Sequence, residues 1–222
     1  MNERSRCVLV ALALLGTTDA FANLVSNPSF ENFTGTFGGD GGRQLTSAST
    51  TLTDWNIAGG EIAVLRTSNS YHLAPSQGDN FLDLAGYSNT GFPKGITQSL
   101  SGLVPGQIYA LALDLGILNG ACIGLANDCH GPIKVMASIG GNSETFTHDS
   151  ALPGNIWSTF GFNFKATAST EVLSIQGISL PPLNAYIGLD NVSVNAVPEP
   201  TVAWLFGAGF LLLGLRMIRR DR

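Results

Sequence analysis

Apolar and polar residues alternate through most of the chain between residues 23 and 196, with the period of two that is typical of half-buried β-strands. In IYALALDLG every odd-numbered residue from Tyr109 to Leu115 is apolar, and in TFGFNFKA every even-numbered residue from Phe160 to Phe164 is phenylalanine. IKVMASIG alternates in the same way from Ile133 to Ile139. These three segments are therefore predicted to be strands with one face in a core.

The remaining strand signals in this region are shorter, and turn dipeptides separate them. They are NLVSNPSFE, GEIAVLR, NFLDLAG, GITQSLS, EVLSIQGIS and AYIGLDNVSVNAV. Pro-Gly stands at 105–106 and 153–154, Gly-Gly at 59–60 and 140–141, and Pro-Pro at 181–182. No segment of the region keeps a helical period of 3.6 over ten residues. About ten short strands between turn signals predict an all-β fold, a β-sandwich or jelly roll.

The N-terminus has the three parts of a secretory signal peptide. A basic start, MNERSR, precedes the ten-residue apolar core CVLVALALLG and a small-residue site that ends at Ala22. Residues 1–22 are therefore predicted to direct export through the secretion translocon, and signal peptidase is expected to leave Asn23 as the first mature residue. A membrane anchor is disfavoured, because ten apolar residues fall well short of the roughly 20 that a span needs.

A second apolar segment lies inside residues 197–222. The fifteen residues from Thr201 to Leu215 carry no charge, and as a helix they would span roughly 22 Å of a hydrocarbon core about 30 Å thick. The segment lengthens to a transmembrane helix of about 201–218 if Arg216 extends its guanidinium toward the headgroups. A buried helix of the folded domain is the alternative, and it is disfavoured because the segment lacks a polar face.

The residues on both sides of this segment resemble a known sorting signal. Pro198, Glu199 and Pro200 stand directly before it, and it is followed by a basic cluster: Arg216, Arg219, Arg220 and Arg222. The positive-inside rule places this cluster in the cytoplasm. The order of tripeptide, apolar span and arginines resembles the PEP-CTERM signal, also known as the ice-binding protein C-terminal domain.

In that family a membrane protease-transpeptidase, the exosortase, recognises the signal in Gram-negative bacteria that make extracellular polysaccharide. The resemblance implies that an exosortase removes or exchanges the tail near Pro198, Glu199 and Pro200. It also implies a location. The protein would be exported, held for a time in the inner membrane by the C-terminal helix, and then placed at the cell surface or in the extracellular matrix of a biofilm.

Charge narrows the classes of partner. Residues 23–200 contain five Lys or Arg against thirteen Asp or Glu, which gives a net charge of −8. A nucleic-acid-binding domain needs clustered Lys and Arg to neutralise phosphates, and this region has no basic stripe. We therefore expect no nucleic-acid partner.

Two cysteines, Cys122 and Cys129, remain once Cys7 has left with the signal peptide. In an exported protein two cysteines this close together are expected to form a disulfide. A zinc site that includes His130 is the alternative, but it needs a fourth ligand and a cysteine spacing more typical of cytosolic proteins.

Several blocks of residues 23–196 together resemble galactose-binding-like jelly rolls. The blocks are NLVSNPSFE, GDNFLDLAG, ITQSLSGLVPGQIYALALDLG, WSTFGFNFKA and IGLDNVSV, in that order. They are similar in particular to a cell-wall-associated family of unknown function from plants and bacteria, and to bacterial carbohydrate-binding modules of this fold. The resemblance implies one such domain in this chain, with its first and last strands side by side.

Related modules bind a structural calcium ion (Ca2+) where those two strands meet. Carried over residue by residue, the resemblance implies that Glu31 and Asp190 supply carboxylate ligands and that backbone carbonyls complete the oxygen shell. The alternative is that Glu31 caps a turn and Asp190 hydrogen-bonds the neighbouring strand.

The sequence carries no recognisable catalytic motif, so we expect a protein that is not an enzyme. It contains neither a G-x-S-x-G elbow nor an H-E-x-x-H motif. His72, His130 and His148 lie in turn-rich or exposed-looking contexts and are interpreted as surface residues. GGDGG at 38–42 lacks the Lys-Ser/Thr of a phosphate loop and is interpreted as a flexible loop.

Two pairs of carboxylates, Asp79 with Asp83 and Glu144 with Asp149, could in principle serve glycoside hydrolysis, which needs two carboxyl groups at a defined separation. Asp83, however, stands on an alternating strand, and Asp79 stands in the turn before it. A polysaccharide hydrolase or lyase is therefore the least favoured function.

Sugar binding is the favoured function, because jelly-roll modules combine aromatic platforms with polar loops. Aromatic rings stack on the apolar face of a pyranose, while Asn and Asp side chains bond its hydroxyls. Core packing is the alternative for one of the aromatic candidates, Trp55. The candidate ligand residues lie in the segments that join the early strands: Trp55, Tyr71, His72 and Tyr87. We therefore expect a surface or matrix protein that binds or organises exopolysaccharide, and the alternative is a structural protein that assembles with copies of itself.

Overall fold

The computed structural model of the chain describes residues 22–88, 90–121, 128–129, 131–179 and 186–198. Within these ranges the regular secondary structure consists of twelve strands and no helix, so the all-β prediction is confirmed there. The strands are β1 (Gly42–Leu45), β2 (Asn56–Ala58), β3 (Ile62–Arg66), β4 (Asn80–Asp83), β5 (Lys94–Ser101), β6 (Ile108–Ala121), β7 (Asp128–Cys129), β8 (Ile133–Ile139), β9 (Asn142–His148), β10 (Gly154–Lys165), β11 (Thr170–Ser179) and β12 (Gly188–Ala196). This part of the chain has no helix long and apolar enough to cross a membrane, and the helix predicted at about 201–218 lies outside it.

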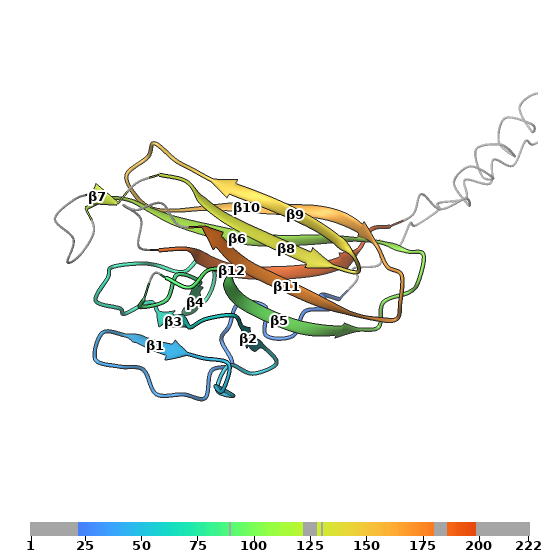
Figure 1. The fold of residues 1–222 in the computed structure, drawn as a ribbon, viewed down its shortest axis with the longest axis horizontal. Helices are drawn as coiled ribbons and strands as arrows, with labels where there is room; N and C mark the ends of the chain where they lie inside the picture. Colours follow the sequence, from blue (N-terminus) through green and yellow to red (C-terminus); the bar gives the residue numbers. More distant parts are fainter. Residues whose placement is uncertain (1–21, 89, 122–127, 130, 180–185, 199–222) are drawn as a thin grey trace, which may run out of the picture.

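The strands form two antiparallel sheets that face each other as a sandwich (Figure 1). One sheet has seven strands, in the order β1-β3-β4-β12-β6-β10, and the short β7 pairs with β6. The other sheet has five strands, in the order β2-β5-β11-β8-β9. Strand order differs from chain order in both sheets because the chain crosses repeatedly from one sheet to the other, as in a jelly roll.

The alternating segments place the core between the two sheets. On β6 the odd-numbered residues from Tyr109 to Leu115 are buried, and on β8 the odd-numbered residues from Ile133 to Ile139 are buried. On β10 Phe164 is buried, while Phe160 and Phe162 are partly buried and pack against the same core. The apolar faces predicted from the sequence are thus the inner faces of the sandwich, and their burial is the main favourable contribution to folding.

The first described residues lie beside the last strand, although they do not form a regular strand of their own. The backbone N–H of Leu24 donates to the carbonyl of Val194, and the N–H of Val192 donates to the carbonyl of Pro28. The predicted meeting of the two segments is therefore confirmed, whereas the strand expected in NLVSNPSFE is replaced by bends. The sequence pattern did not predict β1, β2, β7 and β9, which are short or mostly polar.

The last strand, β12, joins the two halves of the seven-stranded sheet. It pairs with β6 along most of its length and with β4 at Gly188 and Leu189. The Asp83 carboxylate reinforces this short seam, because its Oδ1 accepts hydrogen bonds from the backbone N–H groups of Ala85 and Ile187. Strands β1, β3 and β4 are joined to the rest of the seven-stranded sheet through this pairing of β4 with β12.

The connection from β3 to β4 covers the outer face of the seven-stranded sheet. A second apolar cluster lies beneath it: Leu65, Leu73, Phe81 and Tyr186, with Trp157 packed against them. The indole of Trp157 lies across Gly116, and its Nε1–H donates to the carbonyl of Ala74. A Cβ atom at Gly188 would collide first with the phenol of Tyr186 and then with the edge of the indole, so glycine allows both rings to approach.

Trp55 belongs to the core and not to an exposed platform. Its side chain is 3% exposed, its ring centroid lies 5.7 Å from that of Phe30, and its indole N–H donates to the carbonyl of Asn27. The physical reason is its position directly before β2, two residues ahead of the buried Ile57, so that the indole shares the inward face of that strand. We therefore remove Trp55 from the candidate ligand residues.

His148 is also buried, contrary to the interpretation from its turn-rich sequence context. It is 4% exposed, packs edge-on against Phe160, and its Nε2 lies 3.1 Å from the carbonyl oxygen of Ile156. It ends β9 on the same face as Phe146, and the alternation of that strand turns it inward. His72 is exposed as expected.

Replacing Trp55 by alanine should lower the free energy of unfolding by about 3–5 kcal/mol, because it removes a filled part of the core. Trp55→Phe should cost less, since it keeps a ring and removes only one of the two donors to the Asn27 carbonyl. Urea denaturation of both variants measures these losses. His72→Ala is the control and should change stability by no more than about 0.5 kcal/mol. A loss below about 1 kcal/mol for Trp55→Ala would contradict the core position.

The free energy of unfolding should fall as the pH rises from about 5 to about 8. Burial raises the pKa of Asp83 and that of Asp190 to about 7, although backbone hydrogen bonds oppose the rise. The native state therefore keeps protons that the unfolded chain releases near pH 4. The stability from these groups is complete below about pH 4 and is lost as the pH passes through about 7.

Asp83→Asn should flatten this decline, because the amide cannot ionise and its oxygen still accepts the two backbone N–H groups. Chemical denaturation at a series of pH values measures the slope for the variant and for Asp149→Asn, an exposed control. Equal slopes in all three proteins would show that Asp83 does not titrate in this range.

Candidate ligand site

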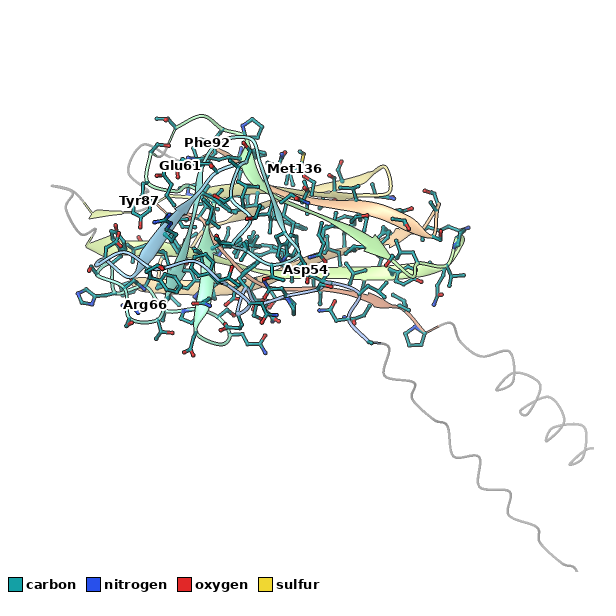
Figure 2. The ribbon with its side chains drawn as sticks, turned by 90° about the horizontal axis from the view of Figure 1, so that it is seen from below. Asp54, Glu61, Arg66, Tyr87, Phe92 and Met136 are labelled. Atoms are coloured by element: carbon teal, nitrogen blue, oxygen red, sulfur yellow. The ribbon has the colours of Figure 1, made fainter. Side chains whose placement is uncertain are left out.

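Two tyrosines from different connections meet at one carboxylate. The hydroxyls of Tyr71 and Tyr87 both donate to Oδ2 of Asp40, over 3.1 and 2.7 Å. Oδ1 of Asp40 accepts the backbone N–H of Gly42 over 3.0 Å. We name Asp40, Tyr71 and Tyr87 the tyrosine–aspartate cluster. The side chain of Tyr87 is 43% exposed, so the cluster presents an aromatic ring at the surface (Figure 2).

A tight turn presents Asp40. The segment GGDGG (38–42) is closed by a hydrogen bond between the backbone N–H of its first glycine and the carbonyl of its last. Gly41 has a φ of 79°, a conformation that glycine adopts without strain. A Cβ at Gly42 would collide with the phenol oxygen of Tyr87. The segment interpreted from sequence as a flexible loop is thus a defined turn whose glycines allow Tyr87 to approach.

Asn69 holds the connection that carries Tyr71. Its side chain is 7% exposed, and its Nδ2 donates to the carbonyls of Arg66 and Leu73. Its Oδ1 accepts the backbone N–H groups of Tyr71 and Leu73. The backbone N–H of Ser70 donates to the carbonyl of Asp40. These bonds fix the connection relative to the turn and place the Tyr71 hydroxyl on the carboxylate.

Glu61 and Lys94 hold the connection that carries Tyr87. The Glu61 carboxylate accepts the backbone N–H groups of Tyr87 and Ser88, over 3.2 and 2.6 Å. Lys94 is fully buried, and its Nζ lies 3.5 Å from Glu61 Oε1, donates to Ser88 Oγ and lies over the ring of Phe92. Glu61, Tyr87 and Phe92 lie at the same end of the molecule in Figure 2. An ammonium buried without a partner would be costly, so this ion pair anchors the connection.

The hydrogen bonds fix the protonation of the cluster. The bond from Tyr87 lowers the pKa of Asp40 more than burial raises it, and the bond from Tyr71 adds to the effect. Burial and the hydrogen bond to Asp40 raise the pKa of both phenols. Burial acts to raise the pKa of Glu61 as well, but the hydrogen bonds from Ser88 and Tyr87 and the charge of Lys94 together lower the pKa. At neutral pH Asp40 is charged and both tyrosines are protonated.

This protonation determines what the cluster can bind. Each phenol donates its one proton to Asp40, so toward a ligand its oxygen acts as a hydrogen-bond acceptor. The exposed ring of Tyr87 offers an apolar face for stacking. The carboxylate of Asp40 contributes a negative charge, whereas that of Glu61 is paired with Lys94. The arrangement suits a ligand that is rich in hydroxyl donors and carries no negative charge.

The sequence identified two of the three residues of the cluster. Tyr71 and Tyr87 were candidates and are brought together, whereas His72 is exposed, with a φ of 55°, and takes no part in the hydrogen bonds of the cluster. Asp40 was missed, because the glycines around it pointed to a loop without a fixed structure. The sequence feature that could have identified Asp40 is a single carboxylate within a glycine-rich turn. Such a carboxylate can accept hydrogen bonds from neighbouring connections.

The two predicted calcium ligands hold the same segment of chain. Glu31 Oε1 accepts the backbone N–H groups of Asp79 and Asn80, and Asp190 Oδ2 accepts that of Gln77. Backbone N–H groups thus donate to carboxylate oxygens that the predicted site assigns to the calcium ion. The described ranges also contain no group of three His, Cys, Asp or Glu side chains that could hold a metal ion. These hydrogen bonds agree with the alternative, in which Glu31 caps a turn and Asp190 bonds a neighbouring segment, and calcium binding stays a prediction that a titration decides.

Glu31→Ala should lower the melting temperature equally in calcium and in chelator, because it removes an acceptor of two backbone N–H groups. The loss should be on the order of 1 kcal/mol, since the side chain is exposed. Differential scanning calorimetry in both conditions measures it, with Glu144→Ala as an exposed control. A melting temperature of the wild-type chain that rises with calcium, and a variant that does not respond, would establish the metal instead.

The remaining residues singled out from the sequence lie at the edges of the described ranges or outside them. The backbone of Cys129 belongs to β7, Ala22 and Asn23 stand at the start of the first described range, and Pro198 is exposed at the end of the last one. The disulfide, the zinc alternative, the signal cleavage and the sorting motif therefore stay predictions. The residues outside the described ranges are Cys122, His130, Glu199, Pro200, Arg216, Arg219, Arg220 and Arg222.

Solved structures with the same sandwich have little sequence in common with this chain. An arabinose-bound α-L-arabinofuranosidase has a TM-score of 0.50 at 12% identity, over 79% of this chain and 26% of the enzyme. The CBM22-1 xylan-binding domain of Paenibacillus barcinonensis Xyn10C has a TM-score of 0.39 at 14% identity, over 71% of this chain and 94% of that domain. A family 35 carbohydrate-binding module from Clostridium thermocellum has a TM-score of 0.40 at 12% identity, over 69% and 96%. The structural neighbours include carbohydrate-binding modules, and the likeness concerns the fold.

Sequence comparisons identify a curated relative and a matching family model. Halomucin of Haloquadratum walsbyi is 26% identical to this chain over 195 residues, which are 87% of this chain and 2% of halomucin. The chain thus spans a small fraction of the length of this curated relative. A family model described as "Protein of unknown function (DUF642)" matches residues 23–194. The chain therefore belongs to the DUF642 family.

Proposed function

We propose that the protein binds an uncharged, hydroxyl-rich polysaccharide through the tyrosine–aspartate cluster, and that it does so as a binding protein and not as an enzyme. The observation that carries the proposal is the convergence of Tyr71 and Tyr87 on Asp40. It leaves two phenol oxygens as acceptors for sugar hydroxyls and one exposed ring for stacking on a pyranose.

Charge supports the choice of an uncharged polymer. Residues 23–200 have a net charge of −8, and the charged carboxylate of Asp40 accepts the hydroxyl of Tyr87. A polymer rich in uronic acids or sulfate would be repelled both by the whole domain and by the site. A neutral chain of hydroxyls meets acceptors and an apolar face without this repulsion.

The place of action follows from the two terminal signals. Residues 1–22 have the parts of a signal peptide, and residues 197–222 have the tripeptide, apolar run and arginines of a PEP-CTERM signal. We therefore place the protein outside the inner membrane of a Gram-negative cell, first anchored by its tail and then processed by an exosortase. In this setting its ligand is the exopolysaccharide of the cell surface or matrix.

Tyr87→Ala should weaken binding to a neutral exopolysaccharide about tenfold or more, because it removes a stacking ring and an acceptor together. Tyr87→Phe should weaken it less, since the ring stays. Affinity electrophoresis or isothermal titration with the full chain measures both, against a neutral polymer and one rich in uronic acids.

Val172→Ala is the matched control, because Val172 is 58% exposed on β11 and takes no part in the cluster. Asp40→Asn tests the carboxylate itself, since the amide oxygen can still accept one phenol while the negative charge is lost. Binding by Tyr87→Ala and Asp40→Asn at wild-type affinity would remove the cluster from the account. Absence of binding to every polymer, together with self-association, would favour a structural matrix protein.

A further inference from the structure

The tyrosine–aspartate cluster and the last described residues lie at opposite ends of the sandwich. The cluster belongs to connections beside β1, β3 and β4, at the left of Figure 1, whereas the turn from β5 to β6 lies at the right. The backbone N–H of Val197 donates to the carbonyl of Ile108 over 2.9 Å. Residues 197–198 therefore lie beside the turn from β5 to β6.

Two large apolar side chains are exposed at this turn. Val104 is 54% exposed and Ile108 is 44% exposed, on either side of the Pro-Gly pair at 105–106. The turn is firmly held, because the N–H of Gln107 donates to the carbonyl of Val104 and the N–H of Val104 donates to the hydroxyl of Tyr109. A further backbone bond joins the turn to the connection between β10 and β11. Val104 and Ile108 are thus presented at a fixed place on the surface.

One positive charge is exposed beside the turn, and one negative charge near it is enclosed. Lys165 is exposed and pairs with Ile108 across the ladder of β6 and β10. Glu171, on the strand that follows, is 7% exposed and accepts the N–H groups of Thr167 and Ala168. Aliphatic side chains beside a lysine are the combination that enters the interface between lipid tails and headgroups.

The sequence brings this surface close to any membrane that the tail enters. Three residues, 198–200, separate Val197 from the uncharged run 201–215. Three fully extended residues span at most about 10 Å. Because Val197 is bonded to Ile108, a membrane that takes up the run lies within a short reach of the exposed side chains of the turn.

We infer that in the tail-anchored form the turn from β5 to β6 rests on the phospholipid bilayer, with Val104 and Ile108 inserted at the interface. This contact orients the domain so that its opposite end, which carries the tyrosine–aspartate cluster, faces away from the membrane and toward the matrix. This inference rests on the proposed anchoring by residues 201–218. The partner is a lipid surface, and two aliphatic side chains are too small an anchor to hold the domain there without the tail.

The test uses the full chain reconstituted in phospholipid vesicles, with a benzophenone amino acid placed at one position at a time. Val104 and Ile108 are the test positions. Leu152 is the matched control, because it is 64% exposed and lies in the connection between β9 and β10, at the other end of the sandwich. Irradiation followed by mass spectrometry measures the yield of lipid adducts, and circular dichroism checks that each variant is folded.

We expect several-fold more lipid adduct at Val104 and Ile108 than at Leu152, in chains that float with the vesicles. Equal yields at all three positions in floating chains would overturn the contact and leave the anchoring intact. A full chain that does not float with vesicles would overturn the anchoring and this inference together. Polysaccharide binding by the cluster is measured separately and is affected by neither result.

Discussion

Strand β12, paired between β4 and β6, holds the seven-stranded sheet together. It joins the layer of β1, β3 and β4, whose connections carry the tyrosine–aspartate cluster, to the long strands β6 and β10. The seam to β4 covers two residue pairs, and the buried Asp83 carboxylate strengthens it by binding backbone N–H groups on both sides. Glu31 and Asp190 act in the same way on the connection that covers this part of the sheet. Carboxylates that bind backbone N–H groups are thus a repeated means of fixing the connections of this domain.

The two proposed contacts lie at opposite ends of the sandwich. At one end, three connections converge so that two phenols share one carboxylate and an aromatic ring stays exposed. At the other end, the turn from β5 to β6 exposes Val104 and Ile108 beside the last described residues. A rigid sandwich between them keeps the ligand site and the turn apart, whatever the tail does. This arrangement suits a protein that holds a polymer on one side and a surface on the other.

The alternation of apolar residues was enough to predict most long strands, because the period of two reports directly which face of a strand is buried. It could not predict β1 or β9, whose residues are mostly polar and are held by their neighbours in the sheet. The site was only partly predictable for the same reason. Asp40 joins the candidate site through contacts with Tyr71 and Tyr87, which lie far from it in sequence. For Trp55 the sequence left both a platform and core packing open, and its place before the inward-facing Ile57 decides for the core.

A polysaccharide is proposed to bind at the end of the sandwich that carries Asp40, Tyr71 and Tyr87. Hydrogen–deuterium exchange of the full chain, with and without a saturating neutral exopolysaccharide, locates the bound polymer. We expect slower exchange in the three connections around residues 38–42, 66–72 and 86–88, and unchanged exchange in the turn at 102–107. Protection that is confined to the outer face of the five-stranded sheet, or absent from all three connections, would contradict it.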